Sequence, residues 1–183
     1  MRIVAGSWRG RRLEAPPGES TRPTADRVRQ ALFDRLMHAP WAGRAAIEGA
    51  TVLDAFAGTG ALGLEALSRG AARTVFIERD RAALTALRAN VAACRAEAMC
   101  RVVPGDALRP PTGEPCTLVF LDPPYGQELL APAMASLRAA GWIGAAALLL
   151  LEIGCDETAP AIGEIVAEFT AGAARVLAVR SDG

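Results

Sequence analysis

The fold class of this chain is decided by residues 52–63, which read VLDAFAGTGALG. An apolar, strand-like run ends at Asp54, and the following glycines fit the pattern G-x-G-x-x-G at positions 58, 60 and 63. Glycines at this spacing let a strand turn tightly into a helix and let the backbone approach a bound ligand. The stretch therefore predicts a nucleotide-type ligand at the end of a strand.

Outward from this turn, strands and helices alternate along the chain. Strands are expected at residues 51–54, 74–78, 101–104, 117–121, 146–152, 165–169 and 175–179. Helices are expected at residues 61–68, 81–94 and 129–140. Repeated strand–helix units indicate a mostly parallel sheet covered by helices on both faces. We therefore predict an α/β, Rossmann-like domain over residues 46–183.

Residues 1–45 are predicted to form a basic N-terminal arm of this domain rather than a second domain. A small β-hairpin is expected over residues 1–14, followed by a Pro/Gly/Ser-rich loop and a helix. The apolar face of that helix is expected to consist of Val28, Leu32 and Leu36. The arginines expected to lie off this face are Arg27, Arg29 and Arg35.

Four acidic residues follow predicted strands: Asp54, Glu78, Asp106 and Asp122. Ligands of open α/β sheets bind beyond the carboxyl ends of the strands. Glu78 lies twenty residues after Gly58, where an acidic side chain can accept hydrogen bonds from ribose hydroxyls. Because four such acids are brought to one edge of the sheet, we expect them to share one binding site.

Asp54 separates two cofactors that the glycine turn would suit, NAD and S-adenosylmethionine. NAD brings a pyrophosphate to the helix N-terminus, where additional negative charge is unfavourable. S-adenosylmethionine carries an ammonium group and a sulfonium and no phosphate. An aspartate directly before the glycine turn therefore favours S-adenosylmethionine.

The tetrapeptide Asp122-Pro123-Pro124-Tyr125 is the most specific signal in the chain. An exocyclic base amine is a poor nucleophile because its lone pair is delocalised into the ring. The Asp122 carboxylate and the Pro123 carbonyl can each accept one N–H bond, which draws the nitrogen toward tetrahedral geometry. Two prolines fix the backbone that holds these acceptors, and Tyr125 can stack on the extruded base. The motif predicts methyl transfer to a base amine.

Composition excludes several other classes of protein. The net charge is zero, but residues 1–45 hold nine Arg against four acids, so the arm carries +5. The four cysteines form no C-x-x-C pair and His38 is the only histidine, which argues against a metal site and suits a reducing cytoplasm. No apolar run is long enough to span a membrane, and nothing in the sequence requires more than a monomer.

The chain resembles the bacterial small-subunit (16S) ribosomal RNA guanine-N(2) methyltransferases, within the class I S-adenosylmethionine-dependent methyltransferases. The resemblance covers residues 2 to about 152 and rests on segments in the arm, the glycine turn through Ala71, Phe76-Ile77-Glu78, the Asp-Pro-Pro-Tyr motif and Gly141-Trp142-Ile143. The N-terminal segments, Arg2 to Gly6 and Trp8 to Leu13, narrow the choice to this family. The segment after Glu152 fits less well, which leaves substrate contacts from the last strands in doubt.

The resemblance implies a class I methyltransferase fold, with residues 122–125 holding the target amine. The cofactor-binding set is Asp54, Phe56, Gly58, Gly60, Glu78, Arg79, Asp106 and Ala107. The implied partner is 16S ribosomal RNA, within a small ribosomal subunit or its assembly intermediate. The arginines expected to contact it are Arg9, Arg11, Arg12, Arg22, Arg27 and Arg29. Trp8 supports this docking, since aromatic rings stack on bases while arginines neutralise phosphates.

Three alternatives stay open at this stage. The same motif serves adenine N6 in DNA or RNA, although 183 residues leave little room for a separate DNA-recognition region. A non-catalytic RNA-binding assembly factor is the second alternative, and the arm could also be an ordinary solvated surface. An NAD-dependent dehydrogenase lacks an evident proton-transfer residue and leaves the Asp-Pro-Pro-Tyr motif unexplained.

Overall fold

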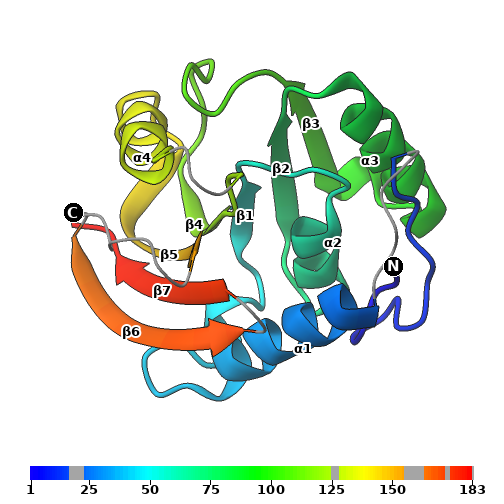
Figure 1. Ribbon diagram of the computed structural model, residues 1–183, viewed down its shortest axis with the longest axis horizontal. Helices are drawn as coiled ribbons and strands as arrows, with labels where there is room; N and C mark the ends of the chain where they lie inside the picture. Colours follow the sequence, from blue (N-terminus) through cyan, green and yellow to red (C-terminus); the bar gives the residue numbers. More distant parts are fainter. Residues whose placement is uncertain (17–22, 125–127, 155–162, 172–173, 183) are drawn as a thin grey trace.

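A seven-stranded sheet with the order β3-β2-β1-β4-β5-β7-β6 forms the centre of the computed structural model (Figure 1). The structure describes residues 1–16, 23–124, 128–154, 163–171 and 174–182. The strands are β1 (Thr51–Asp54), β2 (Arg73–Glu78), β3 (Cys100–Pro104), β4 (Cys116–Leu121), β5 (Ile143–Gly154), β6 (Glu164–Ala171) and β7 (Ala174–Arg180). Neighbouring strands from β3 to β5 are parallel, and β7 is antiparallel to both β5 and β6. The chain order reverses between β1 and β4, which is where open α/β sheets bind ligands.

Successive residues of the central strands enter opposite hydrophobic cores. Val52 and Leu118 pack into one core, whereas the next residues, Leu53 and Val119, pack into the other. This alternation follows from the two-residue period of a strand. Because both faces are covered, the strands consist of nearly uninterrupted apolar residues.

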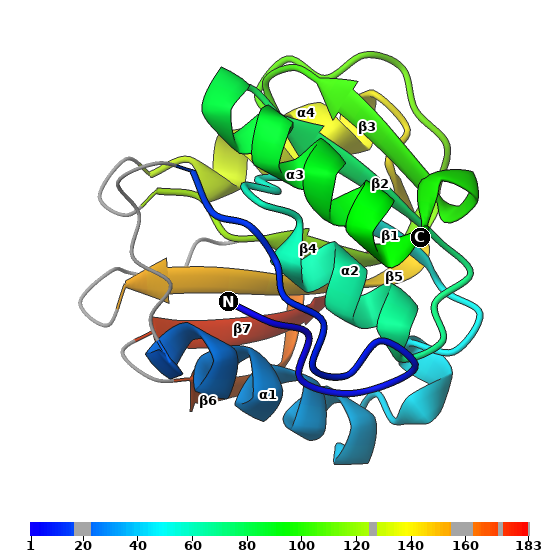
Figure 2. The ribbon, with the colours of Figure 1, turned by 90° about the vertical axis from the view of Figure 1, so that its right-hand side faces the viewer.

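Three helices cover one face of the sheet and a fourth covers the other. Figure 2 shows α1 (Pro23–His38), α2 (Ala61–Ser68) and α3 (Arg81–Cys94) in front of the sheet. Their buried side chains belong to the core that contains Val52, and those of α4 (Leu130–Ala139) belong to the core that contains Leu53. The prediction of a mostly parallel sheet with helices on both faces is confirmed.

The predicted bounds of α2 and α3 agree with the structure, whereas β5 begins earlier than expected. The apolar run predicted a strand from residue 146, but β5 starts at Ile143. Between these positions the pairing with β4 shifts register, and Ala146 takes a positive φ of 54°. Two short 3-10 turns, η1 (Arg44–Ala46) and η2 (Glu97–Met99), were not predicted, because three residues are too few to show a period.

Within the predicted basic segment, residues 1–16, called the arm below, form a short hairpin-like loop with one antiparallel bridge between Arg2 and Arg12. Backbone N–H groups of Ile3 and Leu13 donate across it to the carbonyls of Arg11 and Met1, at 2.9 and 3.0 Å. The arm also bonds to α2, with the Ser7 N–H donating to the carbonyl of Ser68 at 2.8 Å. Figure 2 shows the arm crossing in front of α2. At Gly6, with φ of +79°, a Cβ atom would lie 1.8 Å from the Ser68 carbonyl oxygen. The close approach of arm and helix therefore requires glycine at this position.

Candidate functional site

A cavity of about 540 Å³ opens beyond the carboxyl ends of β1 to β4. Its walls contain all four of the acids predicted to converge, together with Pro123 and Pro124. The other predicted cofactor residues that line it are Phe56, Gly58, Arg79 and Ala107. The strand ends thus bring together residues that lie up to 70 positions apart in the sequence.

Gly60 does not line this cavity, although the resemblance implied that it would. It is buried at the N-cap of α2 with φ of 79°, and a Cβ atom there would lie 2.3 Å from Leu87 Cδ1. Gly60 therefore permits α2 and α3 to pack closely behind the cavity. Gly58, with φ of +52°, has open space where a Cβ atom would point, so it is the glycine at which a ligand can approach the backbone.

The Glu78 carboxylate organises the loop around the cavity. Its Oε2 accepts a hydrogen bond from the Gly58 N–H at 2.7 Å. Its Oε1 accepts bonds from the N–H groups of Arg79 and Asp80, at 2.8 and 2.7 Å. A carboxylate offers about four acceptor positions, so one remains for a ligand hydroxyl. Glu78 can hold the loop and bind a ribose hydroxyl at once.

Asp106 and Arg79 form the rim of the cavity beside Glu78. Asp106 Oδ1 accepts a hydrogen bond from the Leu108 N–H at 3.0 Å, and its Oδ2 lies 3.4 Å from the Arg79 guanidinium. Arg79 is largely exposed, so this ion pair contributes little to stability. Arg79 neutralises only Asp106, so the remaining carboxylates give the cavity an excess of negative charge.

Asp54 is buried below the wall of this negatively charged cavity, whereas Asp122 lies on the wall and is exposed to solvent. Burial raises the pKa of Asp54 to about 7. The hydrogen bond that Asp54 accepts from the Gly63 N–H lowers this pKa, and repulsion from Glu78 raises it further. Dense surrounding protein likewise raises the pKa of Asp122 to about 8, with further repulsion from Glu152 and Asp54. A cationic ligand would relieve the repulsion.

The Asp-Pro-Pro segment follows β4 directly, where the order of the sheet reverses. Pro123 is buried and Pro124 is exposed, and both line the cavity with Asp122. Tyr125 lies outside the described residues, so its stacking role stays a prediction. Rigid backbone at the end of a buried strand holds the Asp122 carboxylate at the cavity wall.

The sequence reasoning missed several residues of this site. Glu152, near the end of β5, faces a hollow shared with Asp122, and an acid near a strand end was the signal used for the other four. Met1 and Pro16 bring both ends of the described arm to the cavity wall. No local pattern could have indicated them, because their position depends on how the arm packs.

Asn90 on α3 joins the arm to the glycine turn and was also missed. Its buried side-chain amide donates to the carbonyls of Thr59 and Glu14, at 2.9 and 3.0 Å. Its oxygen accepts from the Glu14 N–H at 2.6 Å. One side chain thus ties the end of the arm to the loop that lines the cavity.

The arginines predicted to contact RNA do not all reach the surface. Arg9, Arg11, Arg12 and Arg27 are exposed, and Arg22 lies outside the described residues. The prediction that Arg29 contacts RNA is wrong. Only 5% of its side chain is exposed, and its guanidinium lies 2.9 Å from Asp26 and 3.5 Å from Glu65. The apolar face of α1 is wider than predicted and includes Phe33, one turn from Arg29, so Arg29 points inward. Burial removes it from any RNA-facing surface.

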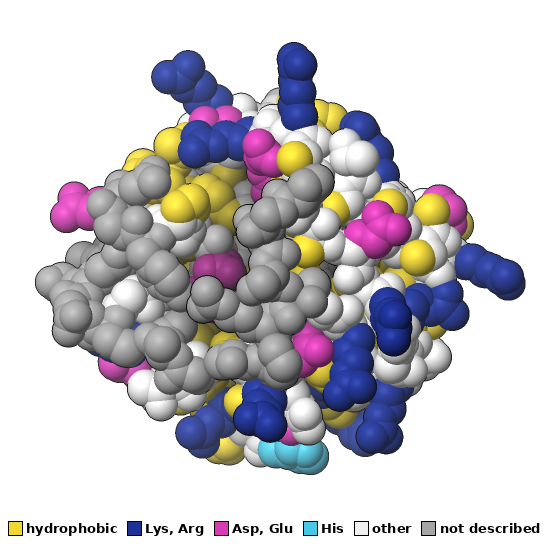
Figure 3. All heavy atoms as spheres, turned by 45° about the vertical axis from the view of Figure 1, so that its right-hand side comes forward, with side chains coloured by type: hydrophobic (Ala, Val, Ile, Leu, Met, Phe, Trp, Pro, Cys, Tyr) yellow, Lys and Arg dark blue, Asp and Glu magenta, His cyan; other side chains and the backbone are white. Residues whose placement is uncertain are grey.

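Figure 3 shows arginine side chains gathered along the right and lower right of the molecule, and a carboxylate in the hollow near its centre.

Among the described residues, no group of three or more His, Cys, Asp or Glu side chains could hold a metal ion. No helix in the described part of the chain is long and apolar enough to cross a membrane.

A parallel sheet extended by an antiparallel β7, with an acidic cavity at its switch point, defines a class I methyltransferase. Comparisons with known proteins narrow this class. The family described as conserved hypothetical protein 95 matches residues 1–177. Ribosomal RNA small subunit methyltransferase D of Escherichia coli (strain K12) is 42% identical over 164 residues, which are 88% of this chain and 79% of the relative. This chain belongs to the ribosomal RNA small subunit methyltransferase D family.

A second relative and a solved structure support the same family. The enzyme of the same name from Haemophilus influenzae is 37% identical, over 86% of this chain and 80% of the relative. The solved structure of the methyltransferase candidate yhhF from Escherichia coli has a TM-score of 0.82 and 39% identity, covering 100% of this chain and 98% of that chain.

Proposed function

We propose that this protein transfers a methyl group from S-adenosylmethionine to the exocyclic N2 of a guanine in 16S ribosomal RNA. The observation that carries the proposal is the cavity itself, where the carboxylates of Asp54, Glu78 and Asp106 meet the Asp122-Pro123-Pro124 segment. Relatives with 37 to 42% identity are named as methyltransferases of small-subunit ribosomal RNA. Chemistry of the site and names of the relatives therefore point to the same reaction.

The residues present fit S-adenosylmethionine, which would supply an electrophilic methyl group on sulfur. Asp54 and the other carboxylates favour its ammonium and sulfonium charges, and Glu78 keeps an acceptor position for a ribose hydroxyl. Phe56 and Ile77 offer apolar wall for a base ring. The pyrophosphate of NAD would meet the same carboxylates and be repelled.

At the target side, Asp122 and the Pro123 carbonyl would each accept one N–H bond from the base amine. These bonds draw the nitrogen lone pair out of the ring and hold it toward the methyl donor, which is catalysis by orientation. The nitrogen would gain the methyl carbon as the carbon–sulfur bond breaks, and it would release one proton to the Asp122 carboxylate. The ionised form of Asp122 is required, because a protonated carboxyl offers weaker acceptance. Tyr125, by resemblance, would stack on the base.

The RNA side of the proposal rests on the exposed arginines of the arm and α1. Arg9, Arg11, Arg12 and Arg27 would neutralise phosphates of the small-subunit RNA. The arm reaches from this basic surface to the cavity wall at Met1 and Pro16. Bound RNA and the reacting base would therefore contact neighbouring parts of one surface.

The first test is transfer of labelled methyl groups to purified small ribosomal subunits that lack modifications, followed by nucleoside analysis. Label in N2-methylguanosine is the expected result. Label in N6-methyladenosine would keep the chemistry and refute the target atom. Cofactor binding without any label would favour a non-catalytic RNA-binding factor.

Asp122→Asn tests the assigned role within the same assay. The substitution keeps the shape but replaces one acceptor oxygen by a donor, so the amine loses its orientation and turnover should fall by about 100-fold, the cost of a misplacement of about 1 Å. Affinity for the cofactor product S-adenosylhomocysteine should change little. Asp182→Asn, at an exposed aspartate outside the cavity, is the matched control and should retain full activity. Cofactor affinity that falls in step with activity would refute the target-side assignment.

A further inference from the structure

The outer face of α3 carries a row of arginines that the proposed function does not use. Arg81, Arg88 and Arg95 are spaced by seven residues and are all exposed. Seven residues are nearly two helical turns, so Arg81 and Arg88 lie on one face of α3, about 10 Å apart along the axis, and Arg95 is the C-cap residue that follows the helix. The row spans roughly 20 Å, from the N-terminus of α3 to its C-cap.

This row adjoins two parts of the site already described. At one end, Asp80, which precedes Arg81, lines the cavity. At the other end, the Arg11 guanidinium of the arm donates to the backbone carbonyl of Ala93 near the end of α3. The row thus connects the cavity rim to the basic arm, where Arg9 and Arg12 are also exposed.

Ion pairs in the part of the chain that the structure describes do not account for these side chains. None of the three forms an ion pair with a carboxylate in the part of the chain that the structure describes, whereas Arg29, Arg44 and Arg69 do. Residues 81–94 contain no acid that could pair with them. Arg81 even occupies the first turn of α3, where the helix dipole disfavours a positive charge.

We propose that α3 and the arm form one continuous surface that binds the RNA phosphate backbone, with Arg81, Arg88 and Arg95 as its central contacts. This inference rests on the proposed function and extends it beyond the arm. Unpaired guanidinium groups spaced along a line match a polyanion whose phosphates repeat along a strand. A backbone held on this row leads to the cavity rim beside Asp80, where a base turned out of the strand would reach Asp122.

The test compares two charge-matched triple variants. In the first, Arg81, Arg88 and Arg95 are all replaced by Gln, which keeps helix propensity. In the control, Arg44, Arg73 and Arg138, exposed arginines on η1, β2 and α4, are replaced by Gln. Thermal unfolding and affinity for S-adenosylhomocysteine verify that both variants fold and keep the cavity.

Binding to a 16S ribosomal RNA transcript and to unmodified small subunits is then measured from 50 to 300 mM salt. Each phosphate contact contributes about 0.7 to 0.9 to the slope of log K against log salt. The first variant should therefore lose about 2 units of slope and bind at least about 10-fold more weakly near physiological salt. The control should keep the slope, the affinity and the kcat of the wild-type protein.

Failure of this surface and failure of the proposed function give different results. If the wild-type protein methylates RNA while the first variant keeps its affinity and slope, the α3 surface is refuted and the function stands. If no RNA is methylated but the slope still falls only in the first variant, the surface stands and the proposed reaction is refuted. A wild-type protein that binds no RNA refutes both.

Discussion

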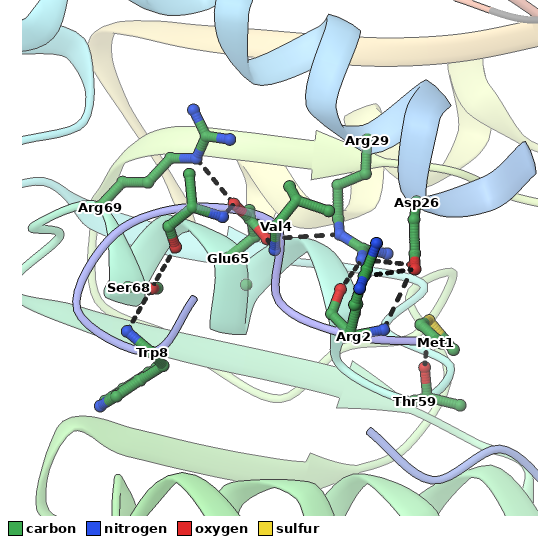
Figure 4. A network of polar contacts seen from close by, with 12 residues as sticks. Met1, Arg2, Val4, Trp8, Asp26, Arg29, Thr59, Glu65, Ser68 and Arg69 are labelled. Carbon is green, nitrogen blue, oxygen red and sulfur yellow. Dashed lines mark hydrogen bonds and ion pairs between the residues drawn. The ribbon is translucent and has the colours of Figure 1, made fainter. Parts of the chain in front are cut away.

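Replacing Glu65 with glutamine should release the N-terminal arm from α2 and destabilise the whole domain. Glu65 is fully buried, and its oxygens accept bonds from the N–H groups of Val4 and Ala5, at 2.8 and 3.0 Å. The same carboxylate lies 2.8 Å from Arg69 Nε and 3.5 Å from Arg29 Nε. Figure 4 shows these groups converging between the arm, α1 and α2.

The expected magnitude follows from what the amide cannot replace. Glutamine keeps the size of glutamate but offers one acceptor oxygen, so one arm N–H group loses its partner. Removing one charge from a buried ion pair costs about 3–5 kcal/mol. Asp26 at 2.9 Å from Arg29, and Asp34 at 3.6 Å from Arg69, still partner the two guanidinium groups. We therefore expect the lower end, about 3 kcal/mol, which is a large part of the 5–15 kcal/mol typical of a domain.

Guanidinium chloride unfolding, followed by circular dichroism, measures this loss in the free energy of unfolding. Limited trypsin digestion with mass spectrometry reports whether the arm is cut faster at Arg9, Arg11 and Arg12. Glu48→Gln is the control, because the Glu48–Arg44 pair at 3.1 Å is exposed and should contribute less than about 1 kcal/mol. Equal small losses in both variants, with an arm still resistant to trypsin, would refute the idea that Glu65 anchors the arm.

Three further predictions concern the cavity and its loop. Gly60→Ala should lower the free energy of unfolding by about 1–3 kcal/mol more than Gly10→Ala does. Both glycines have a positive φ, but of the two only Gly60 lacks space, because its added Cβ atom would lie 2.3 Å from Leu87 Cδ1. Asn90→Ala leaves the carbonyls of Glu14 and Thr59 without their buried hydrogen-bond donor. The affinity for S-adenosylhomocysteine should fall, and the free energy of unfolding should fall by about 2 kcal/mol. Calorimetry that shows neither change would exclude the link between arm and loop. The affinity for S-adenosylmethionine, whose sulfur is cationic, should rise relative to that for S-adenosylhomocysteine, whose sulfur is uncharged, as pH increases through about 7 to 8. The reason is that the carboxyls of Asp54 and Asp122, with pKa values raised to about 7 and about 8, lose their protons in this range. A ratio of the two affinities that does not change with pH would contradict this prediction.

The raised pKa of Asp54 also affects stability with a defined sign. The folded state favours the protonated form, so the stabilisation is fully present below about pH 4 and is lost as pH rises through about 7. Asp54→Asn should flatten that part of the pH profile of unfolding. The buried Asp54 carboxylate therefore makes the folded state less stable at neutral and higher pH than at acidic pH.

The strand–helix order and the strand-end acids could be read directly from the sequence. The apolar runs of the buried strands, the glycine turn and the Asp-Pro-Pro-Tyr motif are local patterns, and each depends on neighbouring residues only. The bounds of α2 and α3 and the convergence of Asp54, Glu78, Asp106 and Asp122 were correct for this reason. Parallel strands carry their carboxyl ends to one edge, so the position of these acids in the sequence already implied a shared cavity.

The packing of the arm was decided only by the tertiary structure. Whether an arginine faces solvent or a buried carboxylate depends on which helix lies against it, and Arg29 was misjudged because Glu65 is 36 residues away. The same holds for Gly60, whose neighbour is Leu87 on another helix, and for Asn90, which joins the arm to the glycine turn. Contacts between distant segments leave no periodic signal in the chain, so a single sequence reveals the chemistry of the cavity but not the parts that hold it in place.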